Sequence, residues 1–88
     1  MKRELRKAIL EYYKWNGDQK IKPVKLLENI NGAEMALVRF TDATGDEMSS
    51  LMSCMEWKSG KWDVSEMWVF WRECEDYFVG QFMKGEKI

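Results

Sequence analysis

The chain has 88 residues, of which 45% are hydrophobic and 33% are charged, and its net charge at pH 7 is −1. This length and composition predict one globular domain, residues 1–88, and exclude a disordered chain and a strongly basic nucleic-acid-binding domain. No apolar run approaches the roughly 20 residues that a membrane span needs. Because the N-terminal residues are charged and no signal segment is recognisable, we expect a cytoplasmic protein.

The charges are unevenly distributed along the chain. Residues 1–25 carry eight Lys or Arg and three acidic residues, whereas residues 26–88 carry six Lys or Arg and twelve acidic residues. Two interpretations are open. A basic N-terminal element can lie over an acidic remainder of the same fold, or it can form a patch for an anionic partner.

Residues 2–15 have the periodicity of an amphipathic helix. Apolar residues recur at i, i+3, i+4 and i+7, and charged residues occupy the other side. Asn16-Gly17 ends the helix, because glycine accepts the left-handed conformation at a helix C-terminus. The apolar stripe comprises Leu5, Ala8, Ile9, Tyr12 and either Trp15 or Tyr13.

Glycines at positions 17, 32, 45 and 60 divide the following part of the chain at similar intervals. Regular turn spacing predicts an antiparallel β-meander. Pro23 places the first strand at an edge, because proline cannot donate a ladder hydrogen bond. The predicted strands are residues 22–30, 33–42, 47–58 and 61–72.

Asn31-Gly32 has the residues that a two-residue hairpin turn requires. Such a turn would pair Leu26 with Leu37 and Glu28 with Met35. One face would then carry Val24, Leu26, Ile30, Met35 and Leu37, and the other Leu27, Ala36, Val38 and Phe40.

A second two-residue turn is predicted at Ser59-Gly60, with Trp57 and Trp62 as its closing pair. The same register would pair Met55 with Val64, Ser53 with Glu66, and Leu51 with Trp68. One face would carry Leu51, Met55, Trp57, Trp62, Val64, Trp68 and Phe70, and the N-terminal helix is expected to cover it. The other face would carry Met52, Cys54, Met67, Val69 and Trp71.

Helices are the alternative for residues 46–58 and 63–84. Four apolar residues between 48 and 55 have helical spacing, and Asp63–Glu66 resembles a capping box. Trp68–Trp71 favours a strand, because aromatic and β-branched residues are enriched in strands. We therefore predict strands up to residue 72 and a helix at residues 73–84, where four residues recur at helical spacing: Cys74, Tyr77, Phe78 and Phe82.

The predicted fold class is α+β, with an N-terminal helix packed on a four-stranded antiparallel meander and a short C-terminal helix. Over residues 2–72 this arrangement resembles the small cystatin-like and nuclear transport factor 2-like domains. Trp57–Val64 is similar to the hairpin of their last two strands, in which a turn glycine precedes a basic residue, a tryptophan and a valine. Their members include enzymes, ligand carriers, protease inhibitors and dimerisation modules, so the resemblance implies no particular function. The cystatin inhibitor loop Gln-x-Val-x-Gly is absent from the chain.

The chain has no histidine, which excludes Ser-His-Asp and Cys-His nucleophilic sites and most zinc sites. We expect no enzyme activity, no metal and no cofactor. Glu66 is the one candidate for a carboxyl group with a raised pKa, although a place at the sheet rim or pairing with a helix lysine is the preferred interpretation. The acidic residues of the loop at 42–47 are interpreted as a solvated turn, and Cys54 and Cys74 as reduced thiols.

The leading functional hypothesis is a non-enzymatic protein-interaction module that dimerises or binds another protein, as adaptors and phage- or plasmid-borne inhibitors do. Contiguous apolar surface marks partner sites, and the predicted partner-binding residues are Met52, Met67, Val69 and Trp71. A small apolar ligand between helix and sheet is the first alternative, in a pocket lined by Trp57, Trp62, Trp68 and Tyr12. Nucleic-acid binding is the second alternative, through a basic patch of Arg3, Arg6, Lys7 and Lys14.

Overall fold

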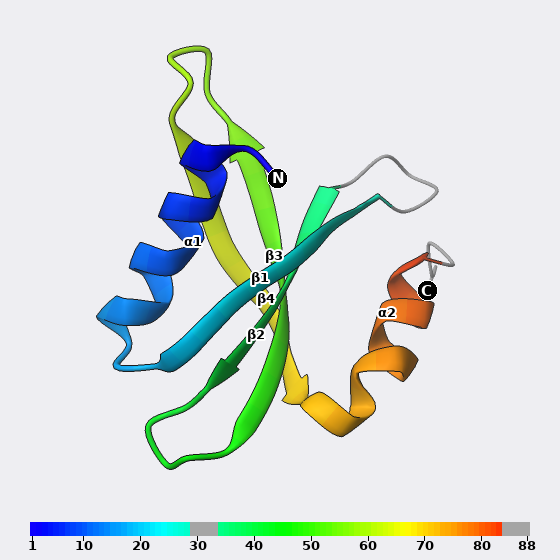
Figure 1. The fold of residues 1–88 in the computed structure, drawn as a ribbon. Helices are drawn as coiled ribbons and strands as arrows, with labels where there is room; N and C mark the ends of the chain where they lie inside the picture. Colours follow the sequence, from blue (N-terminus) through cyan, green and yellow to red (C-terminus); the bar gives the residue numbers. More distant parts are fainter. Residues whose placement is uncertain (29–33, 84–88) are drawn as a thin grey trace.

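The computed structural model describes residues 1–28 and 34–83. The elements follow in the order α1 (Arg3–Trp15), β1 (Gln19–Glu28), β2 (Glu34–Thr41), β3 (Glu47–Glu56), β4 (Trp62–Trp71), the 3-10 helix η1 (Arg72–Cys74) and α2 (Glu75–Met83). The strands form one antiparallel sheet in the order β1-β2-β3-β4. Helix α1 lies on one face of the sheet and α2 on the other (Figure 1). The α+β class, the meander and both helices are therefore as predicted, and the helical alternative for residues 47–56 and 62–71 is wrong.

Helix α1 buries Leu5, Ile9 and Tyr13 completely. These residues are spaced by four, so they form a single stripe along one side of the helix. Trp15 is 88% exposed. Of the two residues considered for the end of the stripe, Tyr13 is therefore the buried one.

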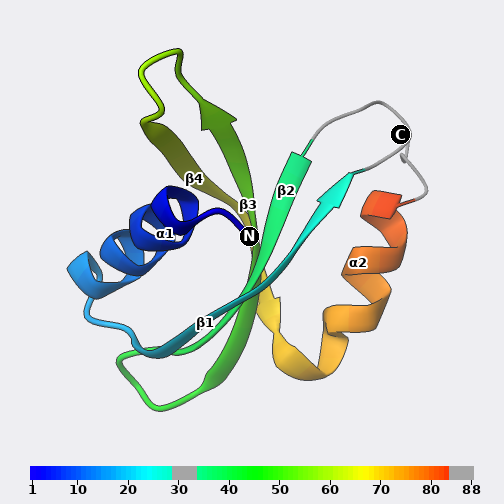
Figure 2. The same cartoon turned by 45° about the horizontal axis from the view of Figure 1, so that its top comes forward.

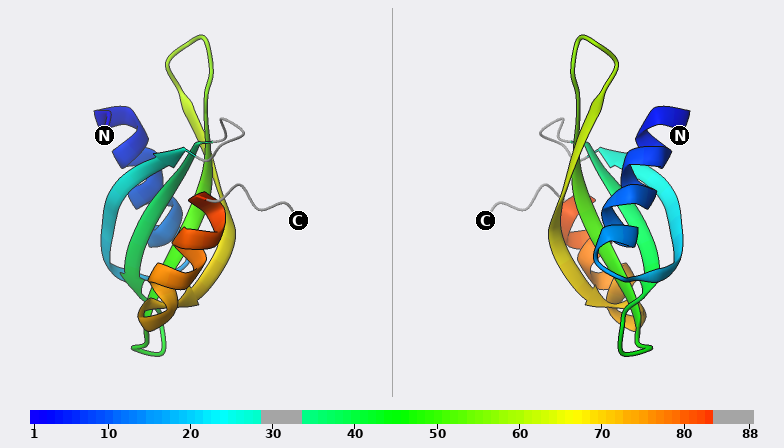
Figure 3. Two further views of the ribbon diagram at one scale, coloured as in Figure 1. Left: turned by 90° about the vertical axis from the view of Figure 1, so that its right-hand side faces the viewer. Right: turned by 90° about the vertical axis from the view of Figure 1, so that its left-hand side faces the viewer.

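Each face of the sheet has its own hydrophobic core, as the opposite placement of the helices in Figure 3 implies. The first core lies under α1 and comprises Leu5, Ile9, Tyr13, Ala36, Val38, Phe40 and Met52. The second core lies under α2 and comprises Leu27, Met35, Leu37, Leu51, Phe70 and Phe82.

The predicted register of β1 and β2 is wrong by one residue. Leu26 pairs with Ala36, and Leu27 with Met35. Leu27 therefore belongs to the second core, and Leu26 is partly exposed. Two register shifts, between Gln19 and Lys22 and between Pro23 and Lys25, increase this difference toward the start of β1. The Asn31-Gly32 turn on which the prediction rested lies outside the described residues.

The Trp57–Trp62 closing pair is also wrong, because the loop between β3 and β4 is longer than two residues. The Trp57 N–H donates to the Lys61 carbonyl at 2.8 Å, and the Gly60 N–H donates to the Trp57 carbonyl at 2.9 Å. Gly60 has a φ of +90°, which completes a three-residue hairpin loop with glycine in the left-handed position. Trp62 pairs with Glu56 instead, and the register continues one residue away from prediction through Cys54–Val64, Ser53–Ser65 and Met52–Glu66.

A bulge in β4 restores the predicted register further along the strand. The register shifts between Met52 and Leu51, with Met67 as the extra residue on β4. Leu51 then pairs with Trp68, as predicted. Because a bulge changes which face the following residues occupy, Trp62 and Val64 pack on the first core, whereas Trp68 contacts Phe82 of α2.

For β3 and the second half of β4 the helices cover the opposite faces from those predicted, whereas Trp62 and Val64 lie under α1 as predicted. Met52 and Cys54 do share a face, but α1 packs on that face and leaves Met52 fully buried. The predicted N-terminal-helix face, with Leu51 and Phe70, is covered by α2 (Figure 2).

Among the described residues, no helix is long and apolar enough to cross a membrane.

Candidate functional site

Strand β4 is an edge strand whose outer side has no neighbouring strand among residues 1–28 and 34–83. An unpaired edge presents backbone N–H and C=O groups that another strand can pair with. Four large apolar side chains on this strand are about half exposed. We call them the β4 edge surface: Met67, Trp68, Val69 and Trp71.

The other edge strand, β1, has several features that block strand addition. It contains Pro23, three exposed lysines at positions 20, 22 and 25, and two register shifts. Proline, lysine and bulges are the common protection of edge strands. Strand β4 contains no lysine and no proline, and one bulge. The two edges of the same sheet therefore differ, and β4 is the less protected one.

Three of the four predicted partner-binding residues lie in the β4 edge surface. Met67, Val69 and Trp71 are 54%, 47% and 52% exposed. Met52 does not belong to this surface, because it is fully buried under α1. The prediction missed Trp68, which it placed in the core. The last strand of a meander has only one neighbour, and this signal could have shown that a large side chain on it stays exposed.

Val69 and Trp71 lie on the same face of the sheet as α1. Val69 pairs with Ser50, whose hydroxyl contacts Tyr13 of α1. Trp71 pairs with Met48, which packs against the first core. Directly paired residues share a face. At Val69 and Trp71, this face of β4 is therefore not covered by α1.

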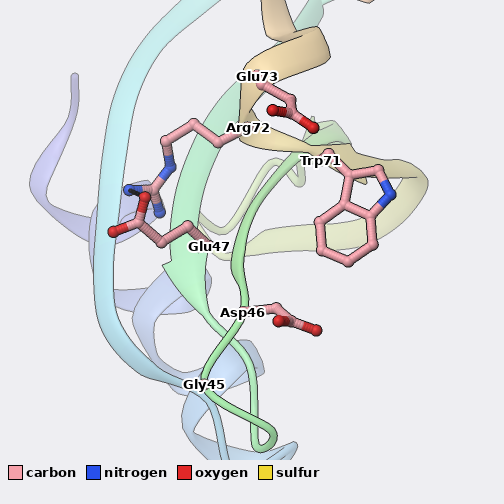
Figure 4. A pocket seen from close by; sticks show the side chains of 6 residues that line it. All are labelled: Gly45, Asp46, Glu47, Trp71, Arg72 and Glu73. Carbon is pink, nitrogen blue, oxygen red and sulfur yellow. Dashed lines mark ion pairs between the residues drawn. The ribbon is translucent and has the colours of Figure 1, made fainter.

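A shallow pocket of about 300 Å³ lies at the end of β4. In Figure 4, Arg72 and Glu47 face each other on one side, while Trp71, Asp46 and Glu73 lie on the other. Arg72 also donates to the carbonyls of Phe40 and Met48, at 3.0 and 3.2 Å. Because three acidic residues and one arginine line the pocket, this end of β4 has an acidic character. The lining residues are Gly45, Asp46, Glu47, Trp71, Arg72 and Glu73.

An open groove of about 650 Å³ runs between α1 and the first half of β4. It contains two of the four residues of the predicted ligand pocket, Tyr12 and Trp62. The other two lie elsewhere: the Trp57 Nε1 donates to Asp63 at 2.9 Å from the hairpin loop, and Trp68 lies against Phe82. The predicted four-residue pocket is therefore not formed. The groove lining is Ala8, Glu11, Tyr12, Lys14, Trp15, Trp62, Asp63 and Val64.

The four predicted basic-patch residues do lie together. Arg3, Arg6, Lys7 and Lys14 are all exposed, and with Leu10 and Glu11 they line one hollow on the outer side of α1. At the start of the helix, Lys2 lies over the Trp62 ring at 5.8 Å and contacts Glu56 at 3.2 Å. The α1 end of the molecule is therefore basic, whereas the Trp71 end is acidic.

Glu66 accepts a hydrogen bond from the Tyr13 hydroxyl at 2.9 Å, and that hydroxyl also contacts the Ser50 hydroxyl. Burial raises the pKa of Tyr13 well above its ordinary value, and the nearby Glu66 carboxylate raises it further. The partner of Glu66 is thus a tyrosine of α1, and not a helix lysine. All three groups satisfy one another inside the fold, which is what buried polar groups require.

The loop at 42–46 is a self-contained turn. Asp42 accepts hydrogen bonds from the Thr44 hydroxyl and from the backbone N–H groups of Thr44 and Asp46. These bonds lower the pKa of Asp42, the Thr44 hydroxyl most. No group of three or more metal-binding side chains occurs within the described residues. Cys54 and Cys74 are both free, and burial raises the pKa of the Cys54 thiol to about 11.

Comparison with protein families, curated proteins and solved structures gave no match to this chain. The resemblance to cystatin-like and nuclear transport factor 2-like domains therefore stays a prediction. Any function assigned to the chain has to come from its own surfaces.

Proposed function

We propose that the protein is a non-enzymatic protein-interaction module that accepts a strand of a partner protein on the open edge of β4. The observation that carries this proposal is the contrast between the two edges of the sheet. Strand β1 has proline, lysines and two register shifts, whereas β4 exposes Met67, Trp68, Val69 and Trp71. Strand addition combines main-chain hydrogen bonds with side-chain contacts on both faces.

The exposed side chains of β4 suit such a contact energetically. Tryptophan removes roughly 150–250 Å² from water when it is fully buried, and Trp68 and Trp71 are still about half exposed. Large aromatic residues dominate interface energetics. A cytoplasmic location, in which Cys54 and Cys74 stay reduced, is part of the proposal.

Replacement of Trp71 by glutamate is expected to weaken association by about thirtyfold, which corresponds to the ~2 kcal/mol of an interface hot spot. The new carboxylate would lie beside Asp46 and Glu73 and would be desolvated by an added strand. Sedimentation velocity over a concentration series measures self-association, and titration of a purified captured protein measures binding to another partner.

Tyr77→Glu is the matched control, because Tyr77 is a similarly exposed aromatic residue that belongs to α2 and not to β4. Its association should equal that of the wild type. Circular dichroism should show that both variants are folded. Unchanged association of the folded Trp71→Glu variant would remove the proposal.

Nucleic-acid binding through α1 is the second candidate function. The favouring observation is the exposed cluster of Arg3, Arg6, Lys7 and Lys14 with Trp15, 88% exposed, at the end of the same helix. Cations can meet phosphates, and an exposed indole can stack on a base. This candidate requires salt-dependent retardation of a single-stranded oligonucleotide that Arg3→Ala, Arg6→Ala and Lys7→Ala together abolish. Absence of retardation at low salt would exclude it.

A further inference from the structure

We infer, on the basis of the proposed function, that the strand added to β4 is the β4 of a second copy of this chain. The two strands pair antiparallel about a two-fold axis. Trp71 of each copy then enters the groove between α1 and β4 of the other copy, so that each groove is completed by its partner.

The first argument is the placement of Trp71 relative to the groove. Antiparallel pairing brings the end of one β4 beside the beginning of the other. Trp71 stands at the end of the strand, and Trp62 and Val64 of the groove stand at its beginning. A two-fold axis perpendicular to the sheet keeps both α1 faces on the same side. Trp71 lies on that face, because its pairing residue Met48 packs on the first core.

The second argument is shape. The groove measures about 650 Å³, is open to solvent, and has aromatic walls from Tyr12, Trp15 and Trp62. Trp71 is 52% exposed, and Trp15 is 88% exposed. Aromatic rings attract one another at interfaces. An isologous contact uses the same surface twice, so both exposed indoles would be covered in both copies.

The third argument is charge complementarity between the two ends of the same edge. Residues 2–15, beside the beginning of β4, carry five Lys or Arg and two Glu, a net charge of +3. The six residues that line the Trp71 pocket include three acidic residues and one arginine, a net charge of −2. Antiparallel pairing places the basic end of each copy beside the acidic end of the other, whereas parallel pairing would place like charges together.

The charges within β4 agree with this arrangement. The only ionisable residues in Trp62–Trp71 are Asp63 and Glu66, both in its first half. Under full antiparallel overlap they lie opposite the uncharged second half of the partner strand. No acidic residue is therefore paired directly with another. The two Glu66 residues come nearest, one position apart across the two-fold axis, and each carboxylate accepts a hydrogen bond from Tyr13 of its own copy. A single surface that matches itself in shape and charge favours a second copy over an unrelated protein.

Two charge reversals test this inference. Lys61 immediately precedes β4, and Glu73 follows its end. In an antiparallel dimer, Lys61→Glu or Glu73→Lys creates two repulsive contacts, and each variant alone should dimerise about tenfold more weakly than the wild type. In a heterodimer of the two variants, one contact is the native pair of Lys61 and Glu73. The other contact has both charges reversed and is also attractive. An equimolar mixture should therefore form heterodimers with close to wild-type affinity.

Sedimentation velocity and native mass spectrometry, with one variant ¹⁵N-labelled, measure the homodimers and heterodimers separately. Lys25→Glu and Glu28→Lys on β1 are controls with the same changes in net charge, and neither should alter dimerisation. Equal homodimer affinity of the wild type and both test variants would overturn the inference. So would a mixture that is no more associated than its components.

The outcome also separates this inference from the proposed function. A wild type that is monomeric at every concentration, but binds another protein through Trp71, would exclude the second copy and leave the proposed function in place. A wild-type dimer that the folded Trp71→Glu variant does not weaken would overturn both.

Discussion

Replacing Tyr13 with alanine is expected to cost about 3–5 kcal/mol of folding free energy, as other large buried aromatic residues do. Tyr13 is fully buried, and its ring lies 4.6 Å from that of Phe40. Since small domains are stable by only about 5–15 kcal/mol, the variant should lose a large fraction of its stability. Urea denaturation followed by tryptophan fluorescence measures the loss. A cost below about 1 kcal/mol would contradict the described core.

Tyr13→Phe separates the hydroxyl group from the ring. It keeps the packing but leaves Ser50 buried without its tyrosine partner, so we expect a loss of about 1–3 kcal/mol. The pKa of Tyr13 is raised in the folded protein. Its hydroxyl therefore contributes stability that is fully present below the unfolded pKa near 10, and that is lost as the pH rises above it. The stability difference between wild type and Tyr13→Phe should shrink above pH 10.

Glu75→Gln is expected to lower the folding free energy by about 1–2 kcal/mol at pH 7. Glu75 accepts two hydrogen bonds from Arg39, at 2.7 and 3.0 Å, and one from Ser49 at 2.7 Å. The glutamine amide cannot accept all three bonds. We take the lower part of the range for charged hydrogen bonds, because the Arg39 side chain is 39% exposed. Urea denaturation at pH 7 measures the difference.

The effect of Glu75→Gln should depend on pH with a defined sign. Its bonds to Arg39 lower the pKa of Glu75, and the bond from Ser49 lowers it further. A lowered pKa contributes stability above the unfolded value near 4.3 and loses it as the pH falls through the folded value. Wild type and variant should therefore converge in acid. Glu47→Gln, at an exposed carboxylate 3.8 Å from Arg72, should cost less than about 0.5 kcal/mol. A constant Glu75→Gln deficit from neutral to acid pH would contradict the assigned role.

The order of elements could be predicted because each has a local signal. Helix α1 follows from the spacing of Leu5 and Ile9, and the strands follow from the recurring glycines. The registers could not be predicted, because they depend on turn length and bulges. Ser59-Gly60 fits either a two-residue or a three-residue loop. The hydrogen bond from the Trp57 N–H to the Lys61 carbonyl identifies the three-residue loop, and this bond exists only in the folded hairpin.

The candidate surface was predictable to the extent that it depends on strand order. Val69 and Trp71 lie near the end of the last strand, and a meander leaves such residues on an edge. Met52 was misplaced because both faces of β3 carry apolar residues, so alternation alone cannot tell which face α1 will cover. The groove beside Trp62 also depends on which face α1 covers. No local sequence pattern indicates that Trp15 lines this groove.

The packing of α1 has a consequence for the order of events during synthesis. The polar partners of Tyr13, Ser50 and Glu66, follow it by 37 and 53 residues. Helix α1 therefore leaves the ribosome well before the strands that cover its apolar side have been made. At about 5–20 residues per second, the helix waits for a few seconds with Leu5, Ile9 and Tyr13 exposed. During this interval the nascent helix is a segment that cellular chaperones can bind, until β4 emerges and Glu66 contacts Tyr13.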